Sequence, residues 1–156
     1  MESLKNVKWD DYTEYAVEQA RRLLEIDSPS GYGEKVTNYL LKEFERLGIK
    51  AGRTNKGGVF ADFGGENCED ALLLEAHCDT LGAMVHQIKE NGRLKLTPVG
   101  GMRPENAEAE NCRILTKAGQ IYDGSCQLLN AAVHVNGDDT VKRDWDTLEV
   151  VIDENV

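Results

Sequence analysis

The sequence lacks any excess of basic residues. Among its 156 residues 28 are Asp or Glu and 18 are Lys or Arg, so the formal net charge is -10, and no cluster of Lys or Arg stands out. Phosphate binding requires a basic footprint, which is missing here. We therefore expect no nucleic-acid partner.

A secretion signal and long hydrophobic runs are also lacking. The opening residues, Met-Glu-Ser-Leu-Lys, lead into a charged amphipathic segment with no apolar h-region, and no later run is long enough to span a membrane. The cysteines form no CxxC motif and lack the regular spacing of a disulfide framework, which favours reduced thiols over disulfides or zinc ligation. These observations predict a soluble, cytoplasmic protein without a membrane partner. The cysteines are Cys68, Cys78, Cys112 and Cys126.

The first half of the chain has helical periodicity. With 40% hydrophobic residues the chain can bury a core, in one domain or two small ones. Apolar residues recur at helical spacing over 9–26 and again over 36–47, where Gly48 closes the pattern. A breaker cluster over 27–33 separates the two segments. Two amphipathic helices are predicted.

Three strands are predicted to follow the helices. Residues 49–53 and 59–63 flank the turn residues Lys56-Gly57-Gly58. The run Ala-Leu-Leu-Leu-Glu-Ala at 71–76 is almost continuously apolar, as in an interior strand that is covered on both faces of an α/β sheet. We expect this third strand to be buried.

After Gly82 the helical signals give way to short alternating strands. Residues 84–90 and 93–97 flank Asn91-Gly92, which predicts a β-hairpin with a two-residue turn. No flexible linker separates the halves, so the β unit is predicted to be inserted at the end of a sheet strand. Further strands are predicted at 113–116, 121–123, 128–134 and 147–153.

The candidate chemistry lies at the junction, in His77-Cys78-Asp79. Ligands of open α/β sheets bind at the carboxyl ends of the strands, and this triplet follows the predicted buried strand. An imidazole can bind a metal ion through one nitrogen while the other donates to a carboxylate. Taken alone, the triplet favours a structural His-Asp hydrogen bond over a metal site. His86 and His134 are expected to be polar strand residues.

The wider pattern resembles the tetrahedral, glutamyl-aminopeptidase-like family. The segment Leu-Leu-Leu-Glu-Ala-His-Cys-Asp-Thr-Leu-Gly at 72–82 is similar to the first metal-site motif of that family. Residues 28–34 resemble its early loop, and 54–58 its turn into the sheet. Residues 88–101 and 107–113 resemble its β-rich lid, so the likeness covers nearly all of the chain in the correct order.

The resemblance implies an α/β fold. Residues 1–82 would be the N-terminal portion of an incomplete, aminopeptidase-type three-layer α/β domain, and 83–156 an inserted all-β lid and dimerisation domain. His77 would be a metal ligand and Asp79 the catalytic carboxylate that orients it. The cofactors implied are two divalent metal ions, zinc or cobalt, and the partners are a peptide substrate and further copies of the chain, bound through the β domain. The remaining ligands and the general base would be encoded beyond Val156, so the chain alone is expected to be inactive.

The sequence departs from the family at Thr80, where members usually carry Glu. This difference points to a subgroup and leaves the preferred N-terminal residue open. Two other functions also stay open. One is a noncatalytic assembly module, and the other is a glycoside hydrolase, which would need two juxtaposed carboxylates.

Overall fold

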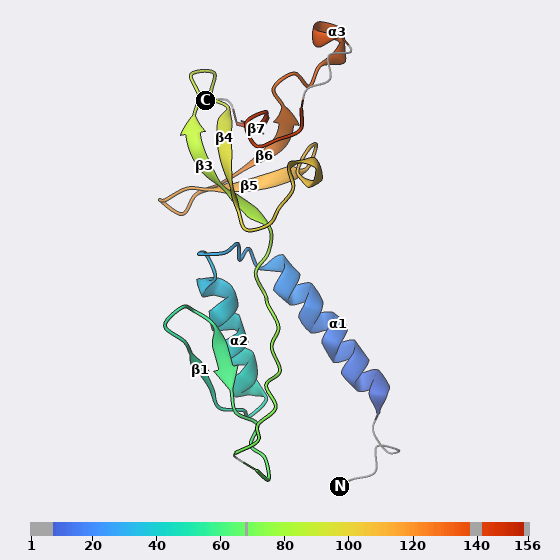
Figure 1. The fold of residues 1–156 in the computed structure, drawn as a ribbon, viewed down its shortest axis with the longest axis vertical. Coiled ribbons are helices and arrows are strands. Elements are labelled where there is room, and N and C mark those ends of the chain that lie inside the picture. The colour runs from blue at the N-terminus through green and yellow to red at the C-terminus, as the bar shows by residue number, and fades with distance from the viewer. Residues whose placement is uncertain (1–7, 68, 138–141, 155–156) are drawn as a thin grey trace. The chain divides into compact units, whose positions relative to one another are not determined.

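The computed structural model describes residues 8–67, 69–137 and 142–154. The chain divides into two compact units, Met1–Thr80 and Leu81–Val156, and each is described by itself (Figure 1). None of the helices in these ranges is long and apolar enough to cross a membrane. Cys68 lies outside the described residues.

The first unit begins with the two predicted helices, which are confirmed. Helix α1 spans Trp9–Glu25, with acidic residues in its first turn and Arg22 in its last, as the helix dipole favours. Helix α2 spans Glu34–Arg46. Gly48 follows it with a φ of 72°, and its N–H donates to the carbonyl of Glu45.

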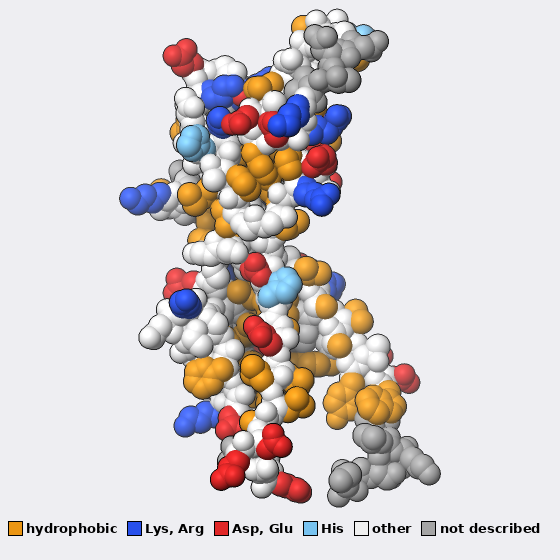
Figure 2. Space-filling view, viewed as in Figure 1, with side chains coloured by type: hydrophobic (Ala, Val, Ile, Leu, Met, Phe, Trp, Pro, Cys, Tyr) orange, Lys and Arg blue, Asp and Glu red, His pale blue; other side chains and the backbone are white. Residues whose placement is uncertain are grey.

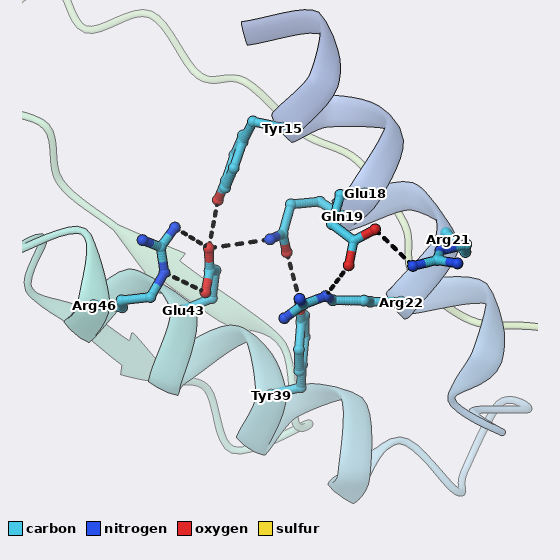
Figure 3. A network of polar contacts seen from close by, with 8 residues as sticks. All are labelled: Tyr15, Glu18, Gln19, Arg21, Arg22, Tyr39, Glu43 and Arg46. Carbon is cyan, nitrogen blue, oxygen red and sulfur yellow. Dashed lines mark hydrogen bonds and ion pairs between the residues drawn. The ribbon is translucent and has the colours of Figure 1, made fainter. Parts of the chain in front are cut away.

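A polar network joins these two helices, with Glu43 of α2 at its centre (Figure 3). Tyr15 Oη donates to Glu43 Oε1 at 2.7 Å, and Arg46 bonds both oxygens of the same carboxylate at 2.6 and 2.9 Å. Gln19 bonds Glu43 at 3.2 Å and accepts a bond from Tyr39 at 2.6 Å. The bonds from Arg46 and then Tyr15 lower the pKa of Glu43 to about 2. The network links α1 to α2 through polar side chains.

A short antiparallel hairpin follows α2, formed by β1 (Ala51–Arg53) and β2 (Val59–Ala61), as the sequence predicts. Its turn closes with Gly57 N–H donating to the Thr54 carbonyl, and Gly57 has a φ of 88°. Thr37 of α2 is buried and donates its hydroxyl to the Gly57 carbonyl at 2.6 Å. This bond fixes the hairpin turn against the helix.

The predicted interior strand at 71–76 is wrong for this structure. The segment is extended but carries no strand pairing, and the side chains of Leu72, Leu73 and Leu74 are 87%, 81% and 85% exposed. Figure 2 shows hydrophobic side chains at the surface of this unit. An apolar run becomes an interior strand only when neighbouring strands bond both of its edges, and no described strand pairs with this segment.

The second unit is a five-stranded antiparallel sheet in the order β3-β4-β7-β6-β5. Leu148 and Val150 of the central strand are 1% and 2% exposed, and they form one core with alternating residues of the neighbouring strands. A 3-10 turn, η2 (Pro104–Asn106), joins β4 to β5. The strands are β3 (Gly82–Ile88), β4 (Leu94–Val99), β5 (Asn111–Leu115), β6 (Ile121–Leu128) and β7 (Leu148–Ile152).

The predicted β3–β4 hairpin is confirmed, but its turn is longer than two residues. Gly92 N–H donates to the Lys89 carbonyl, and Lys89 N–H donates to the Arg93 carbonyl. Gly92 has a φ of 79°, whereas Asn91 has no positive φ, so this is not the mirror-image turn that Asn-Gly favours. It is a three-residue loop, 90–92, that ends in a left-handed glycine, which is another common way to close a hairpin.

The strand predicted over 128–134 is also wrong. Strand β6 ends at Leu128, which pairs with Leu148, the first residue of β7. No described strand pairs with the segment after Leu128, and α3 (Val133–Asn136) forms a single helical turn. His134 is therefore an exposed helical residue and not a strand residue. His86 is in β3 as expected, at an irregularity in the pairing with β4.

Candidate metal centre

The candidate site is the His77–Asp79 pair, on the extended segment that ends the first unit. In an extended chain, side chains two positions apart lie on the same side, so these two can meet. His77 Nδ1 lies 2.8 Å from Asp79 Oδ1. The two side chains are 88% and 50% exposed. The pair predicted from the sequence is therefore formed in the structure.

Both oxygens of the Asp79 carboxylate are engaged. Oδ1 meets the imidazole of His77, and Oδ2 accepts a bond from Ser30 Oγ at 3.1 Å. The bonds from His77 and then Ser30 lower the pKa of Asp79 below its ordinary value. A carboxylate can only accept, so the proton between the two side chains belongs on Nδ1. A neutral ring with its proton on Nδ1 has its lone pair on Nε2, the arrangement that metal-binding histidines use.

The donor chemistry fits one corner of a divalent metal site. Imidazole nitrogen suits zinc and cobalt, and catalytic zinc normally takes three protein ligands. Among the described residues no group of three or more His, Cys, Asp or Glu side chains is placed to hold a metal ion. His77 and Asp79 are thus one ligand and its orienting partner, and further ligands would have to join them.

Three further residues at this site were not assigned from the sequence. Ser28 and Ser30 lie in the loop that follows α1, and Thr80 follows Asp79. Ser28 forms hydrogen bonds with Thr80 and with the Cys78 carbonyl, and Ser30 forms one with Asp79. The separations in sequence are 49 to 52 positions. No local pattern reveals such pairings, although the resemblance to the family's early loop does single out residues 28–34.

Solved structures of aminopeptidases share this fold. An aminopeptidase from the archaeon Desulfurococcus kamchatkensis aligns with a TM-score of 0.75 at 20% identity, over 91% of this chain and 38% of that one. The dodecamer PhTET1-12s aligns with a TM-score of 0.72 at 22% identity, over 88% of this chain and 39% of that one. The fold of the described chain is therefore a mixed α/β fold similar to that of the tetrahedral aminopeptidases.

Sequence comparison gives the family. The M42 glutamyl aminopeptidase family matches residues 57–156, so this chain belongs to that family. The protein named "Putative aminopeptidase YhfE" from Bacillus subtilis is 36% identical over 141 residues, which cover 90% of this chain and 41% of that protein. The lysyl aminopeptidase of Pyrococcus furiosus is 28% identical over 134 residues, which cover 85% of this chain and 38% of that protein. The chain thus spans about two fifths of the length of these relatives.

Proposed function

We propose that the chain is the N-terminal part of a metal-dependent aminopeptidase that removes N-terminal residues from peptides at a dinuclear site. The observation that carries the proposal is the His77–Asp79 pair, whose geometry leaves one imidazole nitrogen for a metal ion, within the region that matches the family. Residues 1–82 would belong to the catalytic α/β domain, and 83–156 would form the inserted lid and assembly domain. The family match favours this function over a glycoside hydrolase or a noncatalytic module.

In this mechanism His77 is one metal ligand, and Asp79 keeps the imidazole of His77 in the tautomer that can bind a metal ion. Two divalent ions, when bound, would supply an activated water and polarise the carbonyl of the scissile bond. Asp79 holds the proton of the imidazole at Nδ1 and raises the basicity of Nε2. Ser30 keeps the carboxylate turned toward the ring. The general base would be a glutamate from outside this chain.

The chain by itself is expected to be inactive. With one ligand and its orienting carboxylate, it should release no p-nitroaniline from amino-acid p-nitroanilides, even with added cobalt or zinc. The protein that contains this chain and the remaining ligands should be active in the same assay. The matched control is the His77→Ala variant of the 156-residue chain. Turnover by the chain that disappears in this variant would contradict the expected inactivity, whereas turnover that survives would identify a contaminant.

We also propose that the chain forms homo-oligomers through residues 83–156, as one structural neighbour is itself described as a dodecamer. Strand β3 is an edge of the sheet, and its Met84 and Ile88 are 63% and 71% exposed. A free sheet edge with apolar side chains favours association. The first unit also has an exposed apolar surface, formed by the leucines at 72–74, through which copies of the chain can associate.

Self-association is therefore expected at micromolar concentration, measured by light scattering. Ile88→Lys and Leu73→Lys should each lower the average mass, because each puts a charge on one of the two surfaces. Val135→Lys is the control, since Val135 is 81% exposed on α3, away from both surfaces in sequence. A strictly monomeric wild-type chain would contradict the expectation. Loss of mass in Leu73→Lys alone would place the association outside the β domain.

A further inference from the structure

The loop after α1 is bound to the candidate site through Ser28. This residue is 1% exposed, and all of its polar groups are used. Its N–H donates to Thr80 Oγ1 at 3.0 Å, its carbonyl accepts the Thr80 N–H at 3.2 Å, and its hydroxyl donates to the Cys78 carbonyl at 2.8 Å. The backbone on each side of Asp79 is therefore held by one buried serine.

This arrangement matters because little else holds the His77 ring. Its side chain is 88% exposed, so packing does not fix its orientation. A bond between an exposed imidazole and an exposed carboxylate competes with water and is weak unless one partner is already in place. Asp79 is in place, because Ser28 and Thr80 fix its backbone neighbours and Ser30 bonds its second oxygen.

We propose that Ser28, Ser30 and Thr80 are positioning residues, which hold Asp79 so that His77 keeps its proton on Nδ1 and presents Nε2 to a metal ion. The proposal rests on the function proposed for His77. It gives a role to Thr80, the position where the sequence departs from the family pattern, because the threonine hydroxyl accepts the N–H of Ser28. The loop over 27–33 is thus part of the metal centre, although it contributes no ligand.

The tautomer of His77 tests this proposal directly, without any metal. Long-range ¹H–¹⁵N spectra of the ¹⁵N-labelled chain, recorded at about pH 8 where a histidine of ordinary pKa is neutral, report which ring nitrogen carries the proton. A free imidazole side chain favours the proton on Nε2. We expect His77 to favour Nδ1, and exposed His86 and His134 to behave as free side chains within the same spectrum.

Two substitutions should return His77 toward the free distribution. Thr80→Val keeps the shape of the side chain and removes its hydroxyl, and Ser30→Ala removes the bond to Asp79. Thr80→Ser should restore the wild-type spectrum, since it keeps the hydroxyl. Thr37→Val is the matched control, because Thr37 is also buried in this unit and donates to a backbone carbonyl, that of Gly57. Loss of the hydrogen bond from Thr37 to Gly57 should leave the His77 tautomer unchanged.

The proposal is overturned if wild-type His77 favours Nε2, or if Thr80→Val and Ser30→Ala leave the distribution as it was. It is also overturned if Thr37→Val shifts the tautomer as far as Thr80→Val does, since the effect would then be general loosening of the unit. The helical signal in the circular dichroism spectrum shows whether each variant is folded. Zinc binding in the complete enzyme tests the function of His77 separately, so the tautomer result can stand while that function fails, and the reverse.

Discussion

Replacing His77 with alanine is expected to remove nearly all aminopeptidase activity and the tightly bound metal from the complete enzyme that carries this chain. The substitution deletes Nε2, the ring nitrogen of His77 that Asp79 does not engage, and a catalytic site with few protein ligands has none to spare. The measurements are kcat/KM on an aminoacyl p-nitroanilide and zinc content after dialysis. His86→Ala is the control, since His86 is exposed in the second unit. Stoichiometric zinc that survives His77→Ala would show that His77 is not a ligand.

Asp79→Asn should have a smaller effect than His77→Ala. The amide oxygen can still accept from His77 Nδ1, but the amide nitrogen cannot accept from Ser30, and the side chain lacks the negative charge that raises the basicity of the ring. Changes of this kind to residues that orient a ligand lower metal affinity or activity by about 10 to 100-fold. An Asp79→Asn enzyme as inactive as His77→Ala would instead assign Asp79 a direct role at the metal.

The second large effect is expected in the sheet of the second unit, at the buried carboxylate of Glu149. This residue lies on central strand β7 with its side chain 3% exposed. Lys89 Nζ bonds its Oε1, and Arg93 Nη1 lies 3.3 Å from its Oε2. Removing both cations in a Lys89→Met/Arg93→Met variant leaves a charge buried without a partner. That costs about 3–5 kcal/mol of unfolding free energy in comparable cases.

Urea unfolding followed by Trp145 fluorescence measures this cost, in a Trp9→Phe background because the chain has two tryptophans. Trp145 packs against the core of the second unit and reports its unfolding. Adding Glu149→Leu to the double variant should recover most of the loss, because the unpaired charge is then gone. Lys142→Met is the control, since its 84% exposed side chain forms a surface pair with Asp144 and should matter little. A loss below about 1 kcal/mol in the double variant would show that water reaches Glu149.

The elements governed by neighbouring residues could be predicted from the sequence. Helices α1 and α2 and the hairpins β1–β2 and β3–β4 form where periodicity and turn residues indicate, because each depends on contacts a few positions apart. The His77–Asp79 pair belongs with them. Two side chains that alternate along an extended segment lie on one side whatever surrounds them, so the central part of the candidate site could be read from the sequence.

Whatever depends on a distant partner could not be predicted in this way. The hydrophobic residues at 71–76 and at 128–134 predict strands. A strand forms only where a neighbouring strand pairs with its backbone, and the side chains of a segment do not reveal whether that neighbour exists. The same holds for Glu149, whose burial on the central strand is tolerated because the β3–β4 turn brings two cations to it.

The sequence by itself determined the local elements, the family resemblance and the His-Asp pair, because these rest on side-chain identity and short spacing. Only the tertiary structure placed Ser28 against Cys78 and Thr80, and Ser30 against Asp79. The loop and the site segment are about 50 positions apart, and hydrogen bonds over that distance form only after the chain has folded. Folding therefore decides how firmly the imidazole is held, and the sequence decides that an imidazole is there.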